Sequence, residues 1–197
     1  KYLVDASGRD TFLASRQKMK QRNAQHNSSA IFGHFSGVER RPGQDAGNIS
    51  VYWFEHGWYW MIPLKDGAMS VGAVCWPYYL KSRNKPVDDF LWDTLRLNPL
   101  LAERMQNARL MGPALATGNF SYQAEQMYGD GWLLIGDAYA FIDPVFSSGV
   151  FLSMNSAELG AQVVDDMLRK GDVSIAANAA ALRRYERLHL RHIEAWR

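Results

Sequence analysis

Residues 132–150 read WLLIGDAYAFIDPVFSSGV. The first four are apolar, as in a buried strand, and Gly136 and Asp137 end the run. Asp137 therefore stands where a buried strand emerges, which is where open α/β sheets place ligand-binding groups. After a turn at Asp143-Pro144, the run Ser147-Ser148-Gly149 opens a helix, whose free N–H groups favour an anion. The stretch predicts a strand, a binding loop and a helix.

A purely structural interpretation of this stretch is open. Asp137 would then cap a turn and Ser147 would cap a helix. One irregular loop joining both residues between a buried strand and a buried helix favours a binding site instead. The helix is expected to end near Gly171. Its spacing predicts a buried face made of Val150, Met154, Ala157, Ala161, Val164 and Leu168.

The rest of the chain alternates between strand and helix signals. Aromatic and β-branched runs separated by glycine-containing turns predict an antiparallel meander at 30–35, 49–54, 58–62 and 69–74. Further strands are expected at 2–4 and 120–122, and helices at 11–25, 86–95, 98–107 and 175–197. This order indicates an α+β fold, or part of an α/β fold whose other strands are missing.

Composition excludes several classes of protein. With 197 residues, 47% of them hydrophobic, the chain can bury a core, and a net charge of +2 gives no case for nucleic acid or an anionic membrane. Asp137 and Asp143 interrupt the most apolar stretch, so no membrane span is expected. Cys75 is the only cysteine, which excludes an intrachain disulfide and favours a reducing, cytoplasmic location.

Three motifs together resemble one family. G-D-A-x-x-F-x-D-P-x-x-S-x-G, from Gly136 to Gly149, resembles the second flavin-contacting motif of FAD-dependent monooxygenase-fold enzymes, in the form found in flavin-dependent halogenases. YLVDASGR at 2–9 resembles the segment that closes the first flavin-binding part of that fold. WYWMIP at 58–63 resembles the W-x-W-x-I-P motif of the tryptophan-halogenase-like superfamily. The motifs occur in family order over about residues 2 to 170.

The resemblance implies an α+β fragment of an FAD-dependent monooxygenase-like α/β fold, in which an antiparallel substrate-domain sheet joins a flavin-contact strand and a long helix. Residues 1–10 would end the first FAD-binding segment and 11–127 would form the substrate-binding sheet domain. Residues 128–170 would be the second FAD-contact segment and 171–197 a C-terminal helix. The family's nucleotide-binding glycines and catalytic lysine would precede this chain, so we expect the fragment alone neither to bind FAD well nor to halogenate.

The implied reaction is the halogenation of an electron-rich aromatic substrate. Reduced FAD, supplied by a flavin reductase, would react with oxygen to a peroxide, and chloride or bromide would attack it to give hypohalous acid. The implied cofactor-binding residues are Asp5, Gly8, Gly136, Asp137, Pro144 and Gly149. The implied halide-binding amides are those of Ser148 and Gly149. The implied substrate or tunnel residues are Trp58, Trp60, Pro63 and Phe146. No metal is expected.

Two features bear on substrate and partners. Phe146 stands where tryptophan-specific members carry a catalytic Glu, so the resemblance favours the branch that acts on phenols, pyrroles or carrier-tethered aromatics. The basic tail at 183–197 is either a helix packed on its own domain or a docking face for an acidic carrier protein, with Arg183, Arg184 and Arg187 as contacts.

Other interpretations stay open. Trp58 and Trp60 alternate in a strand, so they share one side while Tyr59 faces the other, and both tryptophans could simply be core residues. An aromatic hydroxylase or another flavoprotein oxidoreductase of the same fold is the nearest rival, which W-x-W-x-I-P disfavours. A non-catalytic interaction module using aromatic side chains and the basic tail is the rival from another class.

Overall fold

The computed structural model describes residues 1–23, 28–118 and 121–196, which fall into two compact units. Unit 1 holds the described residues up to 23 and from 121 onward, and unit 2 holds 28–118. Phe120, Arg197 and the end of the helix expected at 11–25 lie outside the described residues. Residues 11–23 and 121–127, which the resemblance assigns to the substrate-binding sheet domain, lie in unit 1.

Unit 2 is built on an antiparallel sheet of order β4-β5-β6-β3-β7, with β8 also paired to β3. Its strands are β3 (Ser29–Ser36), β4 (Ser50–Phe54), β5 (Gly57–Pro63), β6 (Met69–Cys75), β7 (Arg109–Leu110) and β8 (Leu115–Thr117). The predicted meander is confirmed for β4, β5 and β6, which follow one another through tight turns. β3 instead pairs with β6, because the long connection at residues 37–49 lets the chain cross the sheet.

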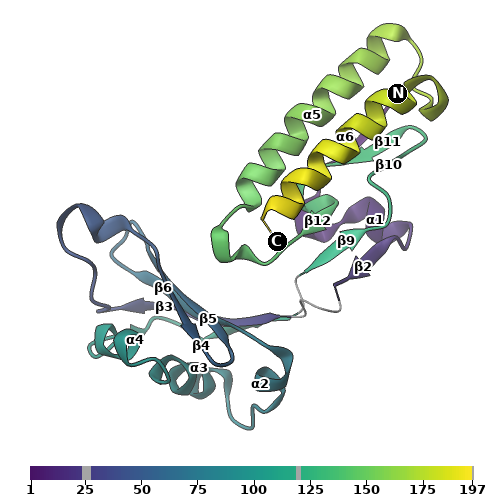
Figure 1. The fold of residues 1–197 in the computed structure, drawn as a ribbon. Coiled ribbons are helices and arrows are strands. Elements are labelled where there is room, and N and C mark those ends of the chain that lie inside the picture. Colours follow the sequence, from purple (N-terminus) through teal and green to yellow (C-terminus); the bar gives the residue numbers. More distant parts are fainter. Residues whose placement is uncertain (24–27, 119–120, 197) are drawn as a thin grey trace. The chain divides into compact units, whose positions relative to one another are not determined.

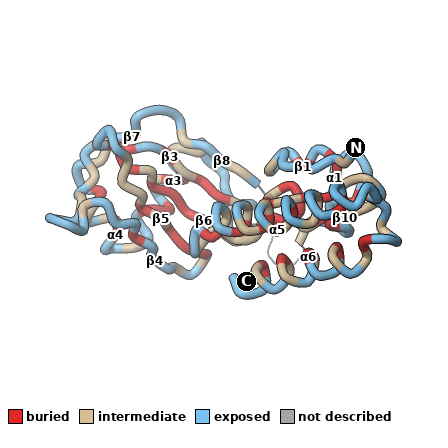
Figure 2. The backbone as a smooth tube through the Cα atoms, turned by 90° about the horizontal axis from the view of Figure 1, so that it is seen from above, coloured by how far each residue is buried: buried red, intermediate tan, exposed pale blue. Residues whose placement is uncertain are grey.

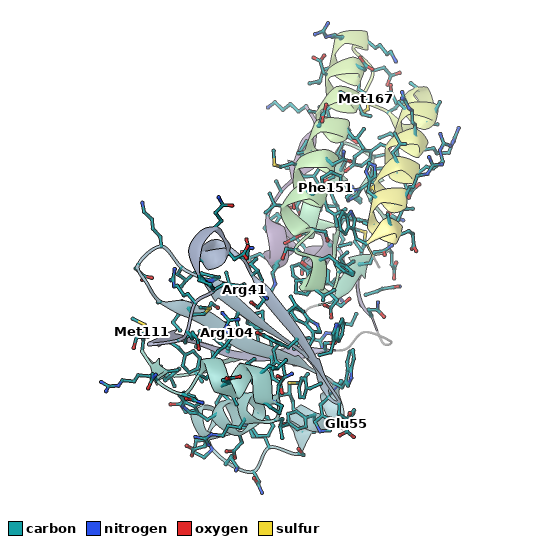
Figure 3. All side chains as sticks on the ribbon, turned by 60° about the vertical axis from the view of Figure 1, so that its left-hand side comes forward. Arg41, Glu55, Arg104, Met111, Phe151 and Met167 are labelled. Atoms are coloured by element: carbon teal, nitrogen blue, oxygen red, sulfur yellow. The ribbon has the colours of Figure 1, made fainter. Side chains whose placement is uncertain are left out.

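Three helices cover one face of this sheet: α2 (Pro77–Lys81), α3 (Val87–Arg96) and α4 (Pro99–Arg104) (Figure 1). The core between them includes Tyr59, whose hydroxyl donates to the Thr94 carbonyl at 2.7 Å. Arg104, labelled in Figure 3, donates from α4 to the hydroxyls of Ser50 and Tyr52. Cys75 is buried in this core, and burial raises the pKa of its thiol to about 12, so it is an inert packing residue.

Unit 1 contains two small sheets. β1 (Leu3–Asp5) pairs in parallel with β11 (Trp132–Leu134), and β10 (Tyr128–Gly129) pairs antiparallel on the other side of β11. The second sheet joins β2 (Lys20–Arg22), β9 (Tyr122–Ala124) and β12 (Ala140–Phe141). The helix expected at 11–25 is wrong in length: α1 (Phe12–Arg16) stops early, Lys18 turns the backbone with φ +58°, and β2 follows.

A helical pair completes unit 1: α5 (Gly149–Lys170) packs on α6 (Ile175–Ala195). Gly171 ends α5 in the left-handed conformation, as predicted, and the Ser174 hydroxyl accepts from the Ala177 N–H to cap α6. Among the described residues, no helix has both the length and the apolar character needed to cross a membrane.

The predicted buried face of α5 is wrong at Val150, Met154, Ala161 and Leu168, which are exposed, whereas Val164 packs against the core of unit 1. Val150, Met154 and Leu168 are 72%, 69% and 53% exposed, and Figure 2 colours much of α5 pale blue for exposed residues. The buried residues of α5 are Leu152, Ser156, Gly160 and Met167. A Cβ at Gly160 would lie 3.3 Å from the side chain of Leu133 in β11 and 3.2 Å from that of Ile135, which directly follows the strand. The helix approaches the strand so closely that small residues belong at the contact, and hydrophobic periodicity misses such a face.

Candidate functional site

Two of the motifs meet at the ends of two paired strands. β1 and β11 run parallel, with Asp5 opposite Leu134, and the Ile135 N–H donates to the Asp5 carbonyl at 3.0 Å. The segments that follow, the 3-10 turns η1 (Gly8–Asp10) and η3 (Gly136–Ala138), contact each other. Segments far apart in sequence thus leave the same edge of a parallel strand pair, where α/β folds bind ligands.

Asp5 supports this edge from within. Its Oδ1 accepts the Ser7 N–H and its Oδ2 accepts the Leu13 N–H, both at 2.8 Å. Burial alone would raise the pKa of the Asp5 carboxyl, but the hydrogen bonds from Ser7 and Leu13 outweigh burial and lower the pKa. Both carboxylate oxygens are therefore engaged by the chain itself, and Asp5 holds the turn that leads to Gly8.

Asp137 has the opposite arrangement: its backbone is held and its carboxylate is left free. The Gly136 N–H donates to the Ser156 hydroxyl at 2.8 Å, and the Tyr122 hydroxyl donates to the Asp137 carbonyl at 2.7 Å. Among the described residues, no hydrogen bond to the Asp137 carboxylate is seen. Burial raises the pKa of this carboxyl and Arg9 partly opposes the shift. A rigidly held, half-buried acceptor of this kind suits a ligand hydroxyl.

Gly136 allows this turn to touch the helix. Its φ is +54°, a conformation that favours glycine. A Cβ at Gly136 would lie 2.7 Å from the Ser153 hydroxyl oxygen and 3.2 Å from the Ser153 Cα. The sequence therefore needs glycine at this position both for the backbone turn and for the close approach to α5.

The loop before α5 presents uncapped amides. The Asp143 carboxylate accepts the Val145 N–H at 3.1 Å and starts the turn η4 (Pro144–Phe146). Ser147 turns the backbone with φ +52° and buried Ser148 precedes the helix, with no capping bond from its side chain. The interpretation of Ser147 as a helix cap is therefore wrong. The first N–H groups of a helix of 22 residues have no partner within the helix, so Ser148 and Gly149 offer donors to an anion.

Aromatic side chains at the end of α6 and directly after it lie against the same loop. The Phe146 ring, 64% exposed, lies 6.3 Å from the Trp196 ring, and the Phe151 ring lies 6.2 Å from it. Phe151, labelled in Figure 3, also contacts His192, with ring centroids 6.0 Å apart. The last turns of α6 thus lie against the loop and the first turn of α5.

The tryptophan motif lies in unit 2. Trp58 and Trp60 share one face of β5 with ring centroids 5.9 Å apart, while Tyr59 enters the helix-covered core, which confirms the predicted sides. The Trp60 indole donates to the Ser70 hydroxyl at 3.1 Å and lies against Gly72, where a Cβ would come within 2.5 Å of the ring. Cross-strand neighbours therefore fix this indole in place. Pro63 ends the same strand.

The predicted site residues thus form two groups. Unit 1 holds Asp5 and Gly8 on the segment that contacts the Gly136-Asp137 turn, and it also holds the loop and helix start with Pro144, Phe146, Ser148 and Gly149. Unit 2 holds Trp58, Trp60 and Pro63. Sequence reasoning missed Ser156, Tyr122 and Arg9 as supports of Asp137. Arg9 directly follows the Gly8 motif and could have been found there. Among the described residues, no cluster of His, Cys, Asp and Glu could hold a metal ion.

Comparisons with known proteins match most or nearly all of the chain. The family model for tryptophan halogenase matches residues 2–197. A 1H-pyrrole-2-carbonyl-(peptidyl-carrier protein) brominase from Pseudoalteromonas luteoviolacea is 35% identical over 87% of this chain and 43% of its own length. A tryptophan 2-halogenase from Chondromyces crocatus is 33% identical over 99% of this chain and 37% of its own length.

The structural comparison agrees. A triple mutant of the flavin-dependent brominase Bmp2 superposes with a TM-score of 0.87 at 31% identity, covering 100% of this chain and 50% of that one. The chain spans less than half the length of these curated relatives.

Proposed function

Because the chain belongs to the tryptophan halogenase family, we propose that it is the substrate-sheet and second flavin-contact portion of an FAD-dependent halogenase that acts on an electron-rich aromatic compound. The observation that carries this proposal is the convergence of β1 and β11. Their ends bring the Gly8 segment beside Asp137, where a half-buried carboxylate is free to bind a ligand.

The residues of unit 1 fit FAD. Asp137 would accept hydrogen bonds from hydroxyl groups of the ribityl chain, because its oxygens are free while its backbone is fixed on both sides. Gly8 turns the backbone with φ +63°, and a Cβ there would meet nothing within 4 Å, so this position leaves open space where the cofactor would lie. Gly136, with φ +54°, lets the turn that carries Asp137 lie against α5. Reduced FAD, when bound, would supply the oxygen chemistry that oxidises chloride or bromide to hypohalous acid.

The chain would hold the halide with backbone amides. Ser148 and Gly149 stand at the positive end of α5, and no described side chain caps this end. An anion there gains from the helix dipole and from unpaired N–H donors. Pro144 shapes the loop that leads to these amides.

The aromatic residues would control access for the substrate. Trp58 and Trp60 are bulky and fixed by their neighbours, so they suit a wall that keeps the substrate away from the cofactor while hypohalous acid passes. Phe146 occupies the place of the catalytic Glu of tryptophan-specific members, so a phenol or a pyrrole is the expected substrate class. We include substrates tethered to a carrier protein, because one relative is named for a pyrrolyl carrier substrate. A separate flavin reductase would supply reduced FAD.

The test is mass analysis of the product formed by the full-length protein. Reduced FAD, oxygen, bromide and either a phenol or a pyrrole-2-carbonyl carrier protein should give a product with the mass and isotope pattern of bromine. Omitting bromide is the control and should abolish the product. A product heavier by one oxygen would support the aromatic hydroxylase instead. A flavin-independent protein complex without turnover would support the interaction module.

The fragment itself provides a second test. Because the nucleotide-binding glycines are expected outside this chain, titration of residues 1–197 with FAD should show binding weaker than micromolar. Sub-micromolar binding by the fragment would contradict the proposed division of the flavin site.

A further inference from the structure

Four arginines form an exposed stripe along α6, which we call the arginine stripe: Arg183, Arg184, Arg187 and Arg191. At 3.6 residues per turn their directions span about 100° of the helix circumference. The buried positions of α6 fall on the opposite side and include Leu182, Tyr185 and Ile193. The stripe is therefore the outward face of a helix whose inward face is already packed.

Among the described residues, the stripe arginines form no ion pair, although Glu194 lies on the same side of α6 and Glu186 lies three residues after Arg183. The ion pairs seen among the described residues join Lys85 and Arg96 to Asp93, and Arg169 to Asp165, and none of them includes a stripe arginine. Like charges three and four residues apart on a helix destabilise it by about 0.2–0.5 kcal/mol per pair. The whole chain carries only +2, so this is a local concentration of charge. Such a face is costly for the isolated helix and suits an acidic partner.

The stripe leads toward the candidate site. Arg191 directly precedes His192, whose ring contacts Phe151 at the start of α5. One turn further on, Trp196 contacts Phe146 in the loop before the uncapped amides. At the same end of the helix pair, Val150 and Met154 are 72% and 69% exposed. Interfaces of specific protein complexes are enriched in arginine and carry apolar side chains at their centre.

We propose that the arginine stripe binds an acidic carrier protein, which delivers the aromatic acyl group on its flexible phosphopantetheine arm. This inference rests on the proposed function. Carboxylates on the carrier would pair with the stripe, and the arm would start beside the α6 end that lies against the Phe146 loop. The stripe would change how fast and how tightly the carrier binds. It would leave the chemistry at Asp137 and Ser148 unchanged, because among the described residues no stripe arginine forms a hydrogen bond or ion pair with either residue.

The test compares two forms of one substrate in the full-length protein. The probes are pyrrole-2-carbonyl on an acidic carrier protein and the same acyl group on N-acetylcysteamine. The triple variant R184E/R187E/R191E should lower kcat/KM for the carrier form by at least about tenfold and leave the small thioester within about twofold. The matched control K65E/K81E/K170E carries the same charge change at exposed lysines elsewhere and should leave both substrates within about twofold.

Binding supplies a readout that does not depend on turnover. Titration of the protein with the loaded carrier, without flavin, should show a Kd at least about tenfold weaker for the stripe variant, and wild-type binding should weaken as salt rises. The conservative variant R184K/R187K/R191K should retain most of the binding, which separates charge from a folding defect.

The outcomes distinguish docking from function. Equal losses on carrier and thioester, or unchanged binding in the stripe variant, would overturn the docking surface. Wild-type bromination of the thioester without binding of the carrier would overturn the docking surface and leave the proposed function standing. Carrier binding that depends on the stripe, with bromination of neither probe, would support docking while the proposed function fails.

Discussion

The Ser156 hydroxyl accepts the Gly136 N–H at 2.8 Å and donates to the Ser153 carbonyl at 3.0 Å, so a buried serine of α5 fixes the turn that carries Asp137. A polar side chain on the inward face of a helix normally costs stability. Here both hydrogen-bonding roles of the hydroxyl are satisfied, which explains its place in the core.

Removing this hydroxyl tests the link between α5 and the turn. Ser156→Ala leaves the buried Gly136 N–H without its partner, and we expect the free energy of unfolding to fall by about 1–3 kcal/mol. Urea denaturation of the chain measures the change. Ser82→Ala, which removes an exposed hydrogen bond to Tyr79, is the control and should change stability by less than about 0.5 kcal/mol. Equal stability of Ser156→Ala and wild type would contradict the contact.

Two glycines offer a matched comparison of backbone strain and crowding. Gly8 and Gly136 both have positive φ, but a Cβ at Gly8 meets nothing within 4 Å whereas a Cβ at Gly136 meets Ser153. Gly8→Ala should cost about 1–2 kcal/mol for the left-handed backbone alone. Gly136→Ala should cost on the order of 1–3 kcal/mol more, because Ser153 must move. Thermal or urea unfolding measures both, and similar costs would show that the close approach to α5 is absent.

Asp137 should make the chain less stable at neutral pH. Burial raises the pKa of its carboxyl in the folded state, so folding favours the protonated form, and stability falls as pH rises from the ordinary value through the raised one. Asp137→Asn should therefore be more stable than wild type at pH 7, and the difference should shrink toward pH 4. Unfolding curves at both pH values check this. A variant less stable than wild type at pH 7 would show that the carboxylate has a partner in the folded chain.

His189 should give the opposite pH dependence. The His189 side chain is 1% exposed and lies between the rings of Tyr139 and Tyr185. Neither of its ring nitrogens has a hydrogen-bond partner among the described residues. Burial, and to a smaller extent the nearby His192, lowers the pKa of His189 to about 4. Because the unfolded residue takes up a proton near pH 6.5, stability should be full above that pH and fall as pH drops toward 4, by on the order of 2–4 kcal/mol.

His189→Leu isolates this contribution. The difference in unfolding free energy between wild type and variant should decline between pH 6.5 and 4. Ser82→Ala, which removes an exposed hydroxyl and no titratable group, should show no such decline. A flat difference for His189→Leu would mean that the imidazole charges freely in the folded chain.

Local pattern was enough to predict the strand before Gly136, the start of α5 at Gly149, its end at Gly171 and the common side of Trp58 and Trp60. Each of these features depends on a few neighbouring residues. The strand follows from an apolar run, the helix start from the turn before it, the helix end from a left-handed glycine, and the shared side of the tryptophans from strand alternation. These features also located the candidate site.

The errors came from contacts between distant segments. The inward face of α5 is set by how closely Gly160 approaches β11, which apolar spacing does not record. The position of β3 beside β6 depends on a long crossover, and β2 exists because β9 pairs with it. The supports of Asp137 were missed for the same reason, since Tyr122 and Ser156 reach it from separate elements.

The central claim is that the free carboxylate at the end of β11 binds FAD. Fluorescence titration of the full-length protein with FAD should show binding at least about tenfold weaker for Asp137→Ala, since one charge-assisted hydrogen bond contributes about 1.5–3 kcal/mol. Asp130→Ala, an exposed carboxylate in the turn before β11, is the matched control and should bind FAD like wild type. Wild-type affinity in Asp137→Ala, or an equal loss in both variants, would contradict the assignment of this strand end as the flavin site.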